Sequence, residues 1–269
     1  MSTIRRISNL LDSLAKVAEW DGVMFSKEYK DLLRKLKKRQ IGGNFCVMCI
    51  VIKAIVSNVI TTFYYYYYTK IKSKESFTFQ GRTYYYFYHK YNSTWRNERA
   101  IEIPIIWNIV KEAKDKIILE VGNVLSHYFD VDYDIVDKYE KAEAVINEDV
   151  VNFHPPKKYD LIVSISTLEH VGWDEDPRVP SKVIKAIENL RELLSLDGRM
   201  IITLPLGYNC EIDKFLMENR LGFDKKYYLK RISRNNKWIE TTWDNVCDIR
   251  YGEPFPYANA LVIGVIERK

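Results

Sequence analysis

Residues 117–123 read Ile-Ile-Leu-Glu-Val-Gly-Asn, an apolar run that ends in an acid, one further apolar residue and a glycine. A short, nearly continuous apolar run of this kind is typical of a strand that is buried on both faces. Glycine at its end allows the backbone to approach a ligand closely, because no side chain stands in the way. The stretch therefore predicts a central strand whose carboxyl end borders a ligand site.

Strand-like runs alternate with helical patterns in the rest of the chain. The clearest helix is expected from Pro180 to just before Gly198, with its apolar residues on one side. Strands separated by helices predict a parallel sheet covered on both faces, and such sheets bind ligands at the carboxyl ends of their strands. The runs are KIILEV (116–121), YDIV (133–136), AVI (144–146), YDLIVSIS (159–166), RMIITL (199–204), a pair around RNNK (234–237), and ALVIGVIE (260–267).

Three further strand ends carry side chains suited to a nucleotide-type cofactor. Asp137 ends the second strand, where an acid can accept hydrogen bonds from a ribose diol. Residues 147–150, Asn-Glu-Asp-Val, offer polar groups for the edge of an adenine ring, and Val150 adds an amide and an apolar wall. Residues 164–171 extend the end of the fourth strand. Asp137 and Asp149 taken singly also fit ordinary helix caps, so the prediction depends on the combination.

In the order EVGN, IVD, NEDV, YDLIVSISTLEHVG and LSLDGRMIITLP, residues 116–206 resemble the successive motifs of class I S-adenosylmethionine (SAM)-dependent methyltransferases. The resemblance is particularly to the group with Leu-Glu-His after the fourth strand. It implies an α/β, Rossmann-like sheet of about seven strands, the last antiparallel, with helices on both faces and SAM across the first four strand ends. It also implies cofactor contacts by Glu120, Gly122 and Asn123 on the methionine side, Asp137 at the ribose, Asp149 and Val150 at the adenine, and Ser166 with Leu168 beneath the sulfonium.

The loop after the first strand departs from the family pattern. The family has a second and often a third glycine where this chain has Val124 and Ser126. The sequence thus leaves open a degenerate, non-catalytic copy of the fold, against which the intact acids at Glu120, Asp137 and Asp149 argue.

His170 is the candidate catalytic base, and Glu169 is the second candidate. Methyl transfer from a sulfonium is an in-line displacement, which an enzyme assists by alignment and exclusion of water. A base is needed only where the acceptor must lose a proton. A backbone hydrogen bond at the strand-to-helix junction is an equally good interpretation of His170. No metal is expected, because Cys46 and Cys49 lie in an apolar run and are better read as buried thiols than as zinc ligands.

The acceptor is expected to be a small molecule or a glycan or lipid precursor, with O-methylation favoured. The Asp/Asn-Pro-Pro-Tyr/Phe signature of amino-group methylation on DNA bases is missing after the fourth strand, and no Pro-Cys nucleophile is present, so DNA is not expected. An NAD-dependent oxidoreductase is a weaker alternative, since residues 122–126 do not supply G-x-G-x-x-G. The alternative from a different functional class is a non-catalytic, membrane-associated binding or scaffold protein with a degenerate methyltransferase fold.

The chain divides by pattern into a helical, basic and apolar extension (1–75), a hairpin with a helix (76–115) and a SAM-binding domain (116–269). Of its 269 residues 47% are hydrophobic and 29% charged, with a net charge of +5. These values exclude wholesale disorder and a polytopic membrane protein. Seven basic residues crowd the stretch 27–39, which is typical of a solvated helix face but also suits an acidic membrane surface or RNA.

Residues 45–63 are apolar enough to span a membrane by length. Their polar residues form one helical stripe, and the heavier basic flank on the N-terminal side would export the SAM-binding part. We therefore expect a packed or membrane-surface helix, with membrane contact through residues 27–68, and keep a true span as the minority alternative. No cleavable signal peptide is visible, so a cytoplasmic protein is expected; the oligomeric state stays open.

The segment between the extension and the core is rich in tyrosine. Residues 77–80 and 83–91 flank Gly81-Arg82, which predicts a β-hairpin. Its tyrosines are expected to pack against the core, with a substrate-pocket floor as the alternative. A helix should follow Thr94, and Pro104 should begin another at its first turn. Arg96 and Arg99 are expected to be exposed helical arginines, with contact to the carboxylate of SAM as the alternative.

Overall fold

The computed structural model describes residues 56–269. The described residues fall into two units: residues 56–73 with 88–94, and residues 74–87 with 95–269. In the first unit, residues 56–66 are helical and continue into a π-helical turn, η1 (Tyr67–Ile71). None of the helices in the described residues is long and apolar enough to cross a membrane. The predictions for the basic stretch 27–39, for the Cys46–Cys49 pair and for residues 45–55 lie outside the described residues.

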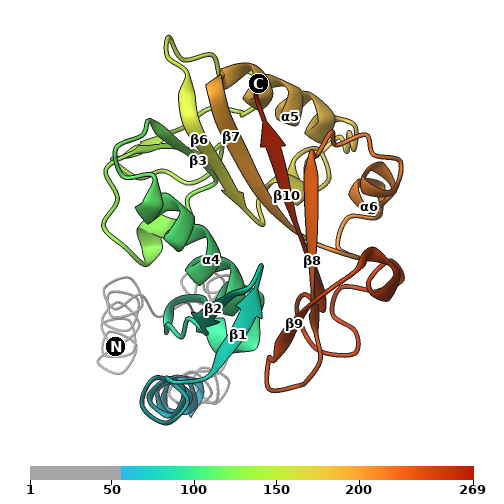
Figure 1. Ribbon diagram of the computed structural model, residues 1–269. Helices are drawn as coiled ribbons and strands as arrows, with labels where there is room; N and C mark the ends of the chain where they lie inside the picture. The colour runs from blue at the N-terminus through green and yellow to red at the C-terminus, as the bar shows by residue number, and fades with distance from the viewer. Residues whose placement is uncertain (1–55) are drawn as a thin grey trace, which may run out of the picture. The chain divides into compact units, whose positions relative to one another are not determined.

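The second unit is built on an eight-stranded sheet in the order β5-β4-β3-β6-β7-β10-β8-β9 (Figure 1). The predicted runs all form strands, and the eighth strand comes from the pair around the RNNK turn. The strands are β3 (Ile118–Val121), β4 (Asp134–Val136), β5 (Val145–Ile146), β6 (Tyr159–Ile165), β7 (Leu194–Pro205), β8 (Lys225–Arg231), β9 (Trp238–Thr241) and β10 (Ala260–Glu267).

The sheet is parallel from β5 through β7 and turns antiparallel at β10. Leu119 of β3 pairs with Ile162 of β6 in parallel register, whereas Ile263 of β10 pairs with Thr203 of β7 in antiparallel register. Strand β9 runs antiparallel to β8 at the edge. Because β3 to β7 are parallel, their carboxyl ends lie on one edge of the sheet, where the sequence predicted the ligand site.

Helices cover both faces of the sheet, which explains why successive residues of β3, of β6 and of the second half of β7 are buried without alternation. Helix α5 (Lys182–Leu193) and helix α6 (Cys210–Met217) bury their apolar sides in a core with Leu119, Ile162 and Ile202. Helix α4 (Arg99–Glu112) lies on the other face of the sheet. Its Glu102 accepts a hydrogen bond from Thr203, and the side chain of Thr203 points to the face opposite that of its neighbour Ile202. Helix α5 ends earlier than predicted, since Leu194 already pairs with Tyr159 as the first residue of β7.

The predicted hairpin consists of β1 (Ser76–Phe79) and β2 (Arg82–Tyr85), joined by Gln80 and Gly81, both with positive φ. Tyr86, next to the hairpin, packs within the same unit as expected: it is 5% exposed and its hydroxyl accepts the amide of Trp238 at 2.9 Å, whereas Tyr85 is 63% exposed. The substrate-floor alternative therefore does not apply to Tyr86.

The prediction that Pro104 begins a helix is wrong. Pro104 lies inside α4, and the segment before it is a 3₁₀ turn, η2 (Tyr91–Arg96). A proline within a helix leaves the carbonyl four residues earlier without its usual donor. Here that carbonyl belongs to Ala100 and accepts the amide of Phe87 at 2.9 Å. The chain after the hairpin thus supplies the hydrogen bond that the helix cannot.

Candidate functional site

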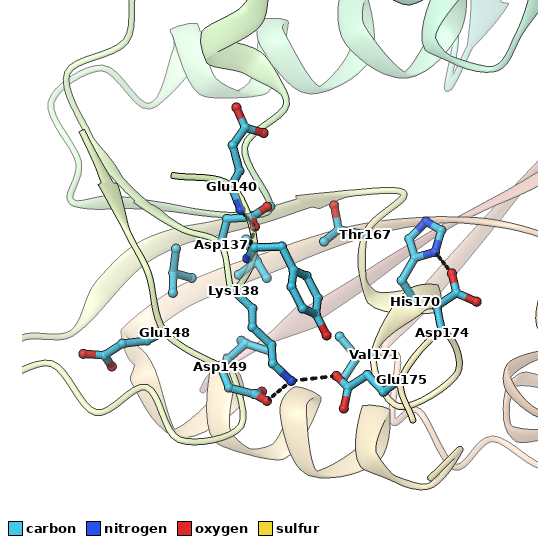
Figure 2. A pocket seen from close by; sticks show the side chains of 15 residues that line it. Asp137, Lys138, Glu140, Glu148, Asp149, Thr167, His170, Val171, Asp174 and Glu175 are labelled. Carbon is cyan, nitrogen blue, oxygen red and sulfur yellow. Dashed lines mark hydrogen bonds and ion pairs between the residues drawn. The ribbon is translucent and has the colours of Figure 1, made fainter. Parts of the chain in front are cut away.

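A cavity of about 450 Å³ lies at the carboxyl ends of β3, β4 and β6 (Figure 2). Its size falls within the range of small-molecule sites in proteins. The wall combines strand-end apolar residues with charged side chains from the loops that follow. The lining residues are Val121, Gly122, Val136, Asp137, Lys138, Tyr139, Glu140, Glu148, Asp149, Val150, Thr167, His170, Val171, Asp174 and Glu175.

Gly122 is required by both its conformation and its neighbour. Its φ is +86°, in the left-handed region that side chains disfavour. A Cβ atom built on it would lie 2.2 Å from Oγ1 of Thr167, at the end of β6. The two strand ends therefore approach too closely for any other residue, and the backbone of Gly122 stays exposed to the cavity.

Glu120 holds the loop after β3 from behind the cavity. Its Oε1 accepts the amides of Val124 at 2.9 Å and Leu125 at 2.8 Å, and its Oε2 accepts the hydroxyl of Tyr133 at 3.1 Å. The side chain is fully buried. Burial raises the pKa of Glu120 to about 7, although these three hydrogen bonds favour the ionised form.

The missing family glycines are not needed by this loop. Val124 has φ −113°, and the following turn, η3 (Leu125–His127), is a 3₁₀ helix in which Ser126 has no positive φ. Side chains are accommodated in such a conformation without strain. The backbone conformation of the loop therefore accepts Val124 and Ser126 in place of the family's glycines.

Asp137 ties together the loops after β3 and β4. Its Oδ1 accepts the amides of Tyr139 and Glu140, both at 2.8 Å, and its Oδ2 accepts the amide of Asn123 at 3.3 Å. An ionised carboxylate has about four acceptor positions, so one remains for a ligand hydroxyl. Beside it, the ring of Tyr139 is 70% exposed and offers a flat apolar surface at the cavity.

Asp149 is part of a four-membered charge ring at one end of the cavity. Lys182 Nζ lies 2.6 Å from Asp149 and 2.6 Å from Glu175, and Lys138 Nζ lies 2.9 Å and 3.2 Å from the same two carboxylates. Burial opposes ionisation of Asp149, but the two lysines outweigh it and lower its pKa to about 2. Figure 2 shows Lys138 reaching both carboxylates, so the ring connects loops that are distant in sequence.

His170 faces the cavity from the turn after β6, η4 (Leu168–His170), and is oriented by a carboxylate. Its Nδ1 lies 2.5 Å from Oδ2 of Asp174, which also accepts the hydroxyl of Tyr208 at 2.7 Å. Burial opposes ionisation of Asp174, but the hydrogen bonds of Tyr208 and His170 prevail and lower its pKa. An ionised Asp174 favours a proton on Nδ1, which leaves the lone pair on Nε2.

A buried polar network supports the end of β6. Glu102 of α4 accepts the hydroxyls of Ser166 and Thr203, both at 2.5 Å, and pairs with Arg99 at 2.8 Å. Arg99 also donates to the carbonyl of Ile165 at 3.0 Å. The network fixes Ser166, whose φ of +39° is unusual for a residue other than glycine. Arg99 was expected to be exposed; its side chain is 13% exposed because Glu102 draws it inward.

Glu169 does not line the cavity. Its side chain is 2% exposed, its Oε2 has no hydrogen-bond partner, and its Oε1 lies 3.6 Å from Nε2 of His170. Burial raises the pKa of Glu169 well above its usual range, which favours the neutral acid.

Half of the predicted site residues line one cavity. These are Gly122, Asp137, Asp149, Val150 and His170, whereas Glu120, Asn123, Ser166, Leu168 and Glu169 lie behind its wall. The sequence analysis missed Lys138, Tyr139, Thr167, Asp174 and Glu175, which also line it. Asp174 had a detectable signal, since it follows His170 by four residues. Among residues 56–269, no group of three or more His, Cys, Asp or Glu side chains is arranged to hold a metal ion.

Comparisons with known proteins give structural similarities alone. No family model and no curated protein sequence matches the chain. The N-methyltransferase NodS from Bradyrhizobium japonicum WM9, in complex with S-adenosyl-L-homocysteine, is 11% identical over 60% of this chain and 84% of its own, with a TM-score of 0.37. A possible histamine N-methyltransferase from Thermotoga maritima is 15% identical over 64% and 98%, with a TM-score of 0.36.

The fold itself follows from the strand pairings of this chain. Strands β5 to β7 are parallel, in an order that places the first core strand, β3, between β4 and β6, and β10 is inserted antiparallel beside β7. The sheet therefore has the Rossmann-like α/β architecture that the motifs of residues 116–206 led us to expect for a class I methyltransferase.

Proposed function

We propose that this protein is a SAM-dependent methyltransferase that acts on a small molecule or on a glycan or lipid precursor, with a hydroxyl group as the favoured acceptor. One observation carries the proposal: the lining of a single cavity unites a strand-end glycine, an acid at the next strand end and an Asp174–His170 pair. The order of the motifs along residues 116–206 supports the same assignment.

The donors and acceptors of the cavity fit SAM. Asp137 has an acceptor position for the ribose hydroxyls, and the exposed ring of Tyr139 can stack on a nucleobase, as aromatic rings commonly do. Asp149 and Val150 would hold the adenine. The backbone of Gly122, which a Cβ atom would cover, allows close approach on the methionine side with Asn123. Glu120 would act through the loop, and Ser166 with Leu168 through the floor of the site.

When bound, SAM supplies a methyl group made electrophilic by the sulfonium. The protein has to align an acceptor with it and remove the acceptor's proton. Nε2 of His170 is the atom suited to take this proton, since Asp174 favours the tautomer in which Nε2 is unprotonated. Asp174 would also stabilise the imidazolium that results. The neutral, buried Glu169 suits a supporting role better than that of a base.

The other candidate functions have less support. An NAD-dependent enzyme would need the glycines that residues 122–126 lack. The function of a non-catalytic scaffold would not require a histidine that is oriented by a carboxylate at the wall of a cavity.

Calorimetric titration of the full chain with SAM, S-adenosylhomocysteine and NADH tests the proposal. We expect SAM binding with a Kd on the order of micromolar, no binding of NADH, and at least tenfold weaker SAM binding in Asp137→Ala. Because Asp137 also caps loop amides, Asp137→Asn serves as the milder variant and Glu188→Gln as a surface control. Folded protein that binds neither SAM nor S-adenosylhomocysteine would overturn the proposal.

A further inference from the structure

The cavity is strongly acidic in a protein that is basic overall. The whole chain has a net charge of +5. The lining nevertheless contains six carboxylates, and Lys138 is the one lysine or arginine that joins them in the described part of the chain. The six are Asp137, Glu140, Glu148, Asp149, Asp174 and Glu175. The charge of the site is therefore opposite in sign to that of the molecule around it.

Only two of these carboxylates are neutralised locally. Asp149 and Glu175 share the ammonium groups of Lys138 and Lys182, so this end of the cavity is close to neutral. Within residues 56–269, no lysine or arginine lies within ion-pair distance of the other four. Their partners are instead backbone amides, an asparagine, histidines and a tyrosine hydroxyl.

Such partners leave the field of a carboxylate in place. A neutral donor stabilises the ionised form by a hydrogen bond but adds no opposite charge. Asp137 illustrates this, since its hydrogen bonds come from the backbone amides of Tyr139, Glu140 and Asn123. In the cavity walls, these uncompensated charges act together on any ligand.

We propose that this charge distribution makes the cavity bind the cationic cofactor SAM more tightly than its neutral product, S-adenosylhomocysteine. The inference rests on the proposed function. The two molecules share the adenosine, amino and carboxylate groups, and they differ by a methyl group and the positive charge of the sulfonium. Methyl transfer removes that charge, so the product loses the attraction of the walls and leaves more readily.

The size of the effect follows from Coulomb's law. One carboxylate at about 10 Å in a water-like medium changes the affinity for a unit charge about twofold. Four such groups favour SAM by roughly tenfold at low ionic strength. Because the Debye length shortens from about 20–30 Å at the lowest salt to a few Å near 1 M, salt should remove most of this preference.

Glu148 is the position at which to vary the charge. Its side chain is exposed, lines the cavity and has no hydrogen bond or ion pair, so Glu148→Gln and Glu148→Lys alter charge without breaking a contact. Glu188 on α5 is equally exposed and lies outside the lining, which makes Glu188→Gln the matched control.

The experiment is a calorimetric titration of SAM and S-adenosylhomocysteine into the full chain, in about 20 mM and about 500 mM salt. We expect SAM to bind more tightly at low salt, with the ratio of the two Kd values falling at high salt. The ratio at low salt should fall about twofold in Glu148→Gln and further in Glu148→Lys. Glu188→Gln should leave it unchanged.

Two failures are distinguishable. If folded protein binds neither ligand, the proposed function itself is wrong. If both ligands bind, the cofactor assignment stands. The electrostatic preference is overturned if the two affinities are equal, or if S-adenosylhomocysteine binds more tightly at low salt. It is also overturned if the ratio of the two Kd values does not change with salt or with the charge at Glu148.

Discussion

Nδ1 of His170 and Oδ2 of Asp174 lie 2.5 Å apart, one helical turn from each other in sequence. The same carboxylate oxygen accepts the hydroxyl of Tyr208 at 2.7 Å, and the rings of Tyr208 and His170 meet edge to face with centroids 5.0 Å apart. The imidazole is thus restrained on two sides, and Nε2 is the nitrogen left for an acceptor.

Replacing either member of this pair should abolish most of the methyl transfer, with a change in SAM affinity of only about twofold where the charge of Asp174 is lost. We expect kcat to fall about 10²–10⁴-fold in His170→Ala, the usual range for loss of a general base. Asp174→Asn should lower kcat by a similar order, because an amide can favour the tautomer with its proton on Nε2. Transfer of labelled methyl from SAM to an acceptor found by screening measures kcat, and calorimetry measures SAM affinity. Asp176→Asn, on the same loop, is the control and should retain activity; equal activity in Asp174→Asn would refute a positioning role.

Gly122→Ala should destabilise the protein and weaken cofactor binding. The new Cβ atom would lie 2.2 Å from Oγ1 and 2.6 Å from Cγ2 of Thr167. The alanine would also have to keep a φ of +86°. We expect a loss of about 2–4 kcal/mol in the free energy of unfolding, measured in urea. Gly252→Ala isolates the conformational part, since Gly252 has φ +83° with nothing within 4 Å of its Cβ position; it should cost only about 1 kcal/mol. Equal losses in the two variants would show that Thr167 does not limit the space.

The pKa of Glu120 predicts a pH-dependent stability. Between the ordinary value of 4.5 and about 7, the native state retains a proton that the unfolded chain has released. Stability from this group is therefore full below the unfolded pKa and is lost as the pH rises through 7. The difference in unfolding free energy between wild type and Glu120→Gln should shift by about 3 kcal/mol from pH 4.5 to pH 8, in favour of the variant at high pH. Urea titrations at both pH values measure it, and a difference that is constant with pH would contradict the assignment.

The buried Arg99–Glu102 pair should contribute far more to the free energy of unfolding than an exposed ion pair does. Arg99→Met leaves the Glu102 carboxylate, which is 0% exposed, without its cation and should lower the unfolding free energy by about 3–5 kcal/mol. Adding Glu102→Leu should restore part of that loss, because no buried charge then remains. Arg82 and Glu112 form a solvated pair, with 62% and 49% of their side chains exposed, so Arg82→Met should leave the unfolding midpoint nearly unchanged. Additive losses in the double variant would show that Arg99 and Glu102 act independently.

The sheet was predictable because its strands are buried on both faces. Runs such as Leu161–Val163 are apolar without interruption, and helices on each side of the sheet leave no solvent face to demand alternation. Pro104 misled the prediction for a physical reason: proline favours the first turn of a helix, but here the amide of Phe87 satisfies the carbonyl that proline leaves unpaired. That partner is close only in the folded chain.

The site was predictable at the strand ends and not beyond them. Gly122, Asp137 and Asp149 follow strands directly, so the topology brings them to one edge. The pairing of Asp149 with Lys138, Lys182 and Glu175 depends on loop conformations, and no spacing in the sequence records it. The burial of Glu169 was likewise hidden, because a short 3₁₀ turn decides which of Glu169 and His170 faces the cavity.

The support that Glu120 gives to the amides of Val124 and Leu125 bears on how related chains are recognised. A pattern that demands two or three glycines in this loop passes over a protein whose loop is held by a buried carboxylate instead. A pattern that asks for the acid two residues before a single strand-terminal glycine, with a tyrosine such as Tyr133 directly before the next strand to meet it, would retain such proteins. Divergent members of the fold are then better sought by the group that satisfies the loop than by the small residues that usually compose it.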